Sequence, residues 1–158
     1  MSTTDTKKAL VQAAGDFLTA NASIVTAAGT VTGLPTIAAA DIARESRTFK
    51  AEGKNPWASI FYQPITPTGR TLGQRGYDQA AGFLQIDFNI APGKGTKILT
   101  DWEEKGRIYF HTGRFFTYSG QGVMVTSCGM SEGRHVENFY RKSLTVAFRS
   151  HIQRQEVL

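Results

Sequence analysis

The chain has 158 residues, of which 41% are hydrophobic and 20% charged, and its formal net charge is +5. This length predicts a single domain, residues 1–158, with a core that needs no disulfide, and the one cysteine, Cys128, excludes an internal disulfide. No apolar run approaches the roughly 20 residues of a membrane span, and the first residues lack signal-peptide order, so we expect a cytoplasmic protein without a membrane partner.

The first predicted element is a helix over residues 5–21. Leu10, Ala14 and Phe17 fall on one stripe of that helix, while charged residues take the other side. Residues 22–44 are rich in Ala and Thr and are interrupted by glycine and proline, so they show no clear period. A short strand near Ile24–Val31 is compatible with this segment.

Residues 57–63 predict a strand, because they are dense in aromatic and β-branched side chains and lie between two prolines. Residues 64–81 follow with five prolines and glycines and no apolar period. A loop of this length in a compact domain is functional or disordered, and we predict a functional loop.

The pattern changes period twice within residues 82–110. Apolar side chains alternate with polar ones in residues 82–90, which predicts a strand with one buried face. The apolar members are Leu84, Ile86, Phe88 and Ile90, and the polar members are Gln85, Asp87 and Asn89. From Thr96 the apolar residues return at helical spacing, and this second helix buries Ile98, Leu99, Trp102, the stem of Lys105, and Tyr109.

The turn Pro92–Gly95 between this strand and helix raises the question of a phosphate-binding loop. Such a loop requires Gly-x-x-x-x-Gly-Lys-Ser/Thr, whereas here Lys94 precedes Gly95-Thr96 and the earlier glycine is missing. We therefore predict an ordinary turn, with Thr96 as the helix N-cap.

Three more strands complete the chain. Residues 114–118 and 123–128 predict a hairpin with a turn at residues 119–122, and a further turn covers residues 129–133. The last strand runs from about residue 137 to 149. The whole order predicts an α+β fold, in which two helices pack on one face of a largely antiparallel or mixed sheet of about five strands.

The other face of this sheet carries polar side chains. Gln85, Asp87 and Asn89 point to it from one strand, and Arg141, Ser143, Thr145 and Arg149 point to it from the last strand. Such a face is either solvated or a surface on which identical subunits meet.

The sequence contains no catalytic or metal-binding pattern. His111, His135 and His151 have no partner at metal-ligand spacing, and Ser119 does not lie in a Gly-x-Ser-x-Gly motif. Glu103 and Glu104 are adjacent on a helix and point to different sides. We expect neither an enzyme nor a bound cofactor or metal.

The positive charge is concentrated in the last third of the chain. Residues 1–104 hold ten basic and ten acidic residues, whereas residues 105–158 hold eight and three. These arginines are spaced apart, without the aromatic residues of a base-stacking surface. A basic face that meets an acidic partner or a neighbouring subunit is therefore favoured over direct DNA binding.

Residues 45–149 combine a series of turns with spaced apolar positions: Glu45, Phe49, Pro56-Trp57, Pro64, Leu72-Gly73, Gly82–Ile86, Pro92–Gly95, a helix ending at Phe110, Ser131–Gly133 and a long last strand. In this pattern they resemble the tail terminator family of long-tailed bacteriophages, and the helix at 5–21 is similar to that family's leading helix. Residues 22–44 depart from the family pattern.

The resemblance implies a structural protein of the virion, at the head-proximal end of the tail. Family members form a homohexameric ring that caps the finished tail tube, stops its polymerisation and provides the docking surface for the head–tail connector protein. DNA then passes through the ring without being read. Within this picture we predict interface roles for Arg70 and Arg75 in the long loop and for Arg114, Arg141 and Arg149 in the basic third.

Two alternatives stay open. The first is another head–tail joining protein, a stopper or adaptor, which would also have a small α+β fold. A basic nucleic-acid-binding module is the other alternative, and a gel shift that weakens steeply with salt would reveal it.

Overall fold

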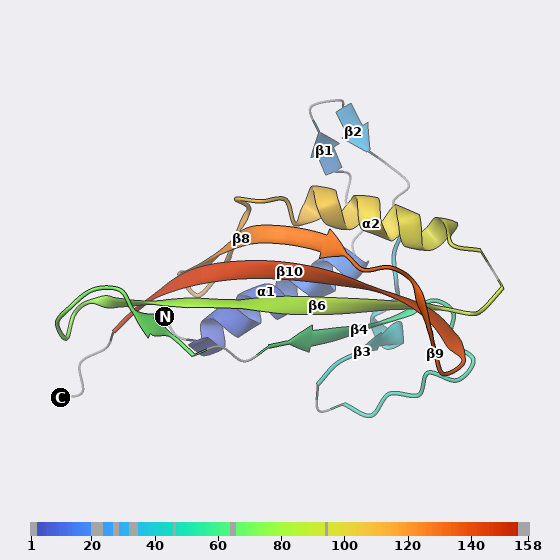
Figure 1. The fold of residues 1–158 in the computed structure, drawn as a ribbon, viewed down its shortest axis with the longest axis horizontal. Helices are drawn as coiled ribbons and strands as arrows, with labels where there is room; N and C mark the ends of the chain where they lie inside the picture. Colours follow the sequence, from blue (N-terminus) through green and yellow to red (C-terminus); the bar gives the residue numbers. More distant parts are fainter. Residues whose placement is uncertain are drawn as a thin grey trace.

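A computed structural model describes residues 3–19, 24–26, 29–31, 35–45, 47–63, 66–93 and 95–154 (Figure 1). Its elements in chain order are α1 (Thr3–Thr19), β1 (Ile24–Thr26), β2 (Gly29–Val31), a 3-10 turn η1 (Ala39–Asp41), β3 (Ile42–Ala43), β4 (Trp57–Tyr62), β5 (Thr68–Gly69), β6 (Tyr77–Ile90), α2 (Lys97–Tyr109), β7 (Phe115–Tyr118), β8 (Gln121–Met130), β9 (Arg134–Val136) and β10 (Phe139–Gln153). In the described part of the chain, neither α-helix is long and apolar enough to cross a membrane.

One mixed sheet dominates the molecule. Six strands follow the order β3-β4-β6-β10-β8-β7, while β5 pairs with β6 and β9 pairs with β10. Among the described strands of this sheet, the β3–β4 pair is parallel and the other pairs are antiparallel. The predicted α+β class is confirmed, but the sheet has eight strands rather than about five. The prediction missed short strands, because two or three residues show no period of their own.

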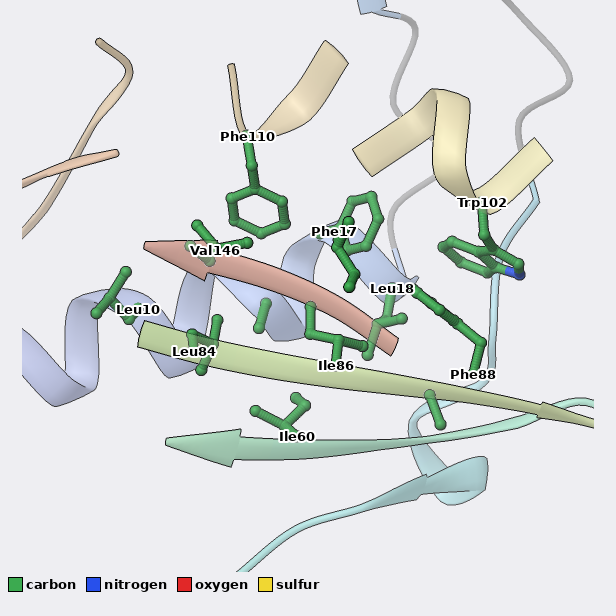
Figure 2. Close-up of a cluster of buried hydrophobic side chains, with 14 of the residues drawn as sticks. Leu10, Phe17, Leu18, Ile60, Leu84, Ile86, Phe88, Trp102, Phe110 and Val146 are labelled. Carbon is green, nitrogen blue, oxygen red and sulfur yellow. The ribbon is translucent and has the colours of Figure 1, made fainter. Parts of the chain in front are cut away.

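Both helices pack on one face of this sheet, as predicted. Phe88 of β6 stacks on Trp102 of α2, with ring centroids 4.9 Å apart, and meets the edge of Phe17 of α1 at 6.4 Å. Figure 2 shows these rings converging with Leu84, Ile86 and Val146 from the central strands. The alternation in β6 and β10 therefore places one set of side chains in a single core.

The two helices follow their predicted stripes with small differences at the ends. Helix α1 begins at Thr3 and ends at Thr19, and residues 20–21 of the predicted helix lie outside the described residues. Thr96 is the N-cap residue of α2, as predicted, although its side chain makes no capping hydrogen bond. The main chain of Thr96 takes part instead, because its carbonyl accepts from Thr100 N at 3.1 Å.

Lys105 is buried as a whole residue, whereas the sequence predicted burial of its aliphatic stem alone. The whole residue is 1% exposed, and its Nζ donates to the Pro35 carbonyl at 2.8 Å. The ammonium group also lies 4.7 Å from the Trp102 ring centroid. Helix α2 thereby holds the segment that follows β2, through a contact between residues 70 positions apart.

Two predicted segments have a different form. Residues 24–26 and 29–31 make an antiparallel pair rather than one strand, and this pair stands beyond α2, away from the sheet (Figure 1). The predicted loop over residues 64–81 is mostly a hairpin, because β6 already begins at Tyr77 and β5 pairs with its first residues. Residues 64–65 lie outside the described residues.

The C-terminal strands agree with the predicted order and extend it. A two-residue turn, Ser119-Gly120, joins β7 to β8, and both residues have positive φ (50° and 82°). This is the turn conformation that suits the twist of a hairpin. The last strand covers Phe139–Gln153 rather than about 137–149. It starts later because Glu137 has a φ of 53° in the turn that links β9 to β10, and it ends later because β10 pairs with β6 as far as Gln153.

Candidate assembly surface

The sheet face opposite the helices, called the open face below, brings together the polar side chains of β6 and β10. The register pairs Arg141 with Asn89, Ser143 with Asp87 and Thr145 with Gln85. Strand alternation predicts this grouping, and the pairing confirms it.

Asp87 is the centre of a hydrogen-bond network at one end of the open face. Its Oδ1 accepts from Ser143 Oγ at 2.6 Å and from Gln85 Nε2 at 2.8 Å. Arg141 donates from Nε to Asn89 Oδ1 at 2.7 Å, and its NH1 lies 3.9 Å from Asp87 Oδ2. The side chains of Arg141 and Asp87 are only 22% and 15% exposed. Arg141 therefore has its main partners within the chain.

Apolar side chains cross the rest of the open face diagonally. Phe61 of β4 and Phe115 of β7 are 48% and 63% exposed. Half-buried residues of the three central strands lie between them. We call this set the diagonal apolar band: Phe61, Phe83, Ala147, Met124 and Phe115. Exposed aromatic side chains gathered on one surface are typical of a protein-contact site.

Arg149 lies within the diagonal apolar band. The register places it between Ala81 of β6 and Met124 of β8, and Met124 is paired with Phe115. Beside it is a hollow of about 290 Å³, bounded by Phe115, Met124 and His151, at Gly120 of the β7–β8 turn and Gly122 after it. Among the described residues, none forms an ion pair or a hydrogen bond with the exposed Arg149 side chain. An arginine without a carboxylate, surrounded by apolar groups, is a common centre of protein interfaces.

Arg70 and Arg75 lie together on the β5–β6 hairpin, at one end of the sheet. Both residues are exposed, and Leu72 between them is 100% exposed. Arg154 braces this hairpin: its Nε and NH2 lie 2.9 and 2.7 Å from Asp78 Oδ1, and its NH1 donates to the Gly73 carbonyl at 2.7 Å. The predicted loop is thus a supported projection that displays two arginines and one leucine.

Arg114 lies apart from the other predicted arginines, on the helix side of the sheet. Its NH1 donates to the carbonyl of Tyr109, the last residue of α2, at 2.6 Å. Its guanidinium carbon lies 4.1 Å from the Tyr109 ring centroid and 4.9 Å from that of Phe116. This half-buried arginine closes the C-terminal end of a helix, where a cation is favoured.

The aromatic residues of the open face were missed by sequence reasoning. Phe61 and Phe83 stand at alternate positions to the core residues Ile60 and Leu84, so strand phase alone assigns them to the open face. A large apolar side chain at a polar-phase position was the available signal.

Two further observations concern the ionisable side chains: possible metal ligands and shifted pKa values. No group of three His, Cys, Asp or Glu side chains in that part of the chain could hold a metal ion. Burial raises the pKa of the Cys128 thiol to about 11, which disfavours its reactive thiolate. Burial lowers the pKa of Lys105 to about 8, but its amino group is directed to a backbone carbonyl in the core.

Comparisons with known proteins give information on the fold only. No family model matches the chain, and no curated protein matches it. Five chains of solved structures match it. One of them aligns with 100% of this chain and 99% of its own length, at 12% identity and a TM-score of 0.63. At such low identity, the similarity shows that the two chains share a fold.

Proposed function

We propose that this chain is a structural protein of a bacteriophage virion that caps the tail tube as a ring. In this role it ends tail polymerisation and forms the surface on which the head–tail connector docks. The proposed partners are further copies of the chain in a homohexamer, the tail tube protein and the connector protein, at the head-proximal end of the tail.

The open face carries this proposal. Its diagonal apolar band exposes Phe61 and Phe115, and its Met124 is paired with Arg149, which has no acidic partner among the described residues. Burying the aromatic side chains against another protein removes apolar surface from water, and an acidic residue of that partner would pair with Arg149. The resemblance of residues 45–149 to tail terminators supplies the kind of assembly.

The β5–β6 hairpin adds a second contact surface in the same proposal. Its position at one end of the sheet leaves the open face uncovered (Figure 1). A ring subunit needs separate surfaces for its neighbours and for the tube or connector, and these two surfaces meet that need.

Charge reversal on the hairpin tests the proposal. Arg70→Glu/Arg75→Glu should leave folding intact, since exposed charges contribute about 0–1 kcal/mol to stability. Reversed charges at a complementary interface suppress docking. We expect particles with unjoined heads and tails, or tails of uncontrolled length, in electron micrographs of lysates complemented with the variant.

The matched control is Arg47→Glu/Lys50→Glu, which changes the net charge equally on the exposed loop between β3 and β4. This control should give normal particles. If a lysate that lacks the wild-type chain already contains joined heads and tails of uniform length, the capping function is wrong. Normal particles from the hairpin variant, at wild-type expression, would exclude the hairpin as a working surface.

A further inference from the structure

We propose that copies of this chain associate head to tail, with the β9–β10 turn of one copy seated on the diagonal apolar band of the next. In this contact Glu137 of the turn pairs with Arg149 of the band. The inference rests on the proposed function, because it names the contact that would join ring subunits.

Two opposite charges without partners motivate the contact. Glu137 and Asn138 form the turn between β9 and β10, because the register pairs Phe139 directly with Val136. Glu137 is exposed, and within the described ranges its carboxylate has neither an ion pair nor a hydrogen bond. Arg149, beside the diagonal apolar band, is also exposed and likewise has no ion pair or hydrogen bond among the described residues. Each supplies the charge that the other lacks.

The two charges cannot meet within one chain. The β9–β10 turn lies at one end of the long axis, and the half of β10 that carries Arg149 extends toward the other end (Figure 1). About ten strand residues separate them, which at about 3.3 Å per residue is roughly 30 Å. Only a second copy can bring Glu137 to Arg149. A contact between different surfaces of identical chains is heterologous, and it produces a ring when the rotation closes.

The turn is held in shape before any contact forms. Arg134 NH2 of β9 donates to Ser143 Oγ at 3.2 Å, and the His135 and Tyr140 rings meet with centroids 5.1 Å apart. Phe139 packs on Trp57 at 5.4 Å. A braced turn loses little conformational entropy on docking. It also presents the half-buried Val136 beside Glu137, which suits an apolar surface.

Arg149 is better placed for this contact than the other cation of β10 on the open face. Arg141 is engaged with Asn89 and Asp87, so a carboxylate there would compete with existing bonds. Arg149 is paired with Met124, Phe115 is paired with Met124 on its other side, and Phe83 is paired with Ala147 two residues before Arg149, so a turn seated there would exclude water from the ion pair. A pair formed there is stronger than one in open solvent.

A charge swap tests the contact in the full-length protein. Arg149→Glu and Glu137→Arg should each weaken self-association by about tenfold or more, because like charges then face each other. The double variant should restore most of the lost affinity, as coupled residues do in a double-mutant cycle. The readout is the dissociation constant from sedimentation equilibrium at low and high salt.

Two controls keep this result interpretable. Arg107→Glu changes the net charge equally on the outer side of α2, where the Arg107 side chain is 73% exposed, and should associate like wild type. Arg149→Gln removes the charge without reversing it and serves if Arg149→Glu is poorly folded by circular dichroism.

Three results would overturn the contact. They are wild-type association by Arg149→Glu or Arg149→Gln, a double variant no better than the single ones, and a wild-type chain that stays monomeric at millimolar concentration. Correctly capped tails from Arg149→Glu would reject this contact and leave the capping function in place. Rings that depend on the pair but fail to cap tails would reject the capping function and leave the contact in place.

Discussion

Phe88→Ala and Phe83→Ala remove the same side chain from opposite faces of β6. Phe88 is 1% exposed, stacks on Trp102 at 4.9 Å and contacts Phe17 at 6.4 Å. Phe83 is half-buried on the open face. The pair therefore compares core burial with open-face burial while the residue type and the strand stay constant.

The expected costs differ by several-fold. Truncation of a buried phenylalanine costs roughly 3–5 kcal/mol, and the loss of two aromatic partners places Phe88→Ala near 4 kcal/mol. In a chain of this size that cost lowers the melting temperature by about 8–16 °C. Phe83→Ala should cost about 1 kcal/mol, because much of its surface is already in water.

Urea unfolding followed by tryptophan fluorescence measures both costs. Low protein concentration and high salt keep association from adding to the apparent stability. Phe83→Ala should then weaken self-association in sedimentation equilibrium, whereas the Phe88 variant should show its main effect in unfolding. Equal unfolding costs for the two variants would refute the assignment of faces in β6.

Three further predictions concern other parts of the molecule. Burial lowers the Lys105 pKa from 10.5 to about 8, so the unfolded chain binds that proton more tightly than the folded chain. Wild type should therefore gain stability relative to Lys105→Met as the pH rises from about 8 to about 10. Urea unfolding midpoints measured in steps of pH check this, and a stability difference that stays constant with pH would contradict it. Cys128, with its pKa raised to about 11, should react with a thiol reagent at pH 8 far more slowly in the folded chain than in urea, and equal rates would show that the thiol is accessible and unperturbed. Gly120→Ala should cost about 1 kcal/mol because Gly120 has a φ of 82°, whereas Gly129→Ala, where an added Cβ meets nothing within 4 Å, should cost less in the same unfolding assay.

Local pattern was enough to determine the layers of this fold. The alternation through Leu84, Ile86 and Phe88 assigns the two faces of β6, and the stripe of Leu10, Ala14 and Phe17 assigns the buried side of α1. These periods are properties of the strand and the helix themselves, so they can be read from neighbouring residues alone. The same alternation predicted that Asp87 and Ser143 would share a face, which the register confirms.

The extent of the strands depends on distant parts of the chain. Residues 77–81 contain no pattern that separates them from a loop, yet they form a strand because β10 pairs with them as far as Gln153. The hairpin before them is held by Arg154 through Asp78, a contact across 76 residues. Such pairings depend on which segments the whole fold brings together, and no local window contains them.

Tertiary structure also decided what each predicted arginine does. The sequence does not distinguish the arginines of the basic third from one another. In the structure Arg114 donates to the carbonyl of Tyr109 at the end of α2, and Arg141 donates to Asn89. Arg149 instead lies in the diagonal apolar band, paired with Met124. The band itself takes one side chain from each of five strands, so it exists only after the sheet register is set. A surface built from side chains that are remote in sequence and adjacent in space cannot be recognised until the strands are paired.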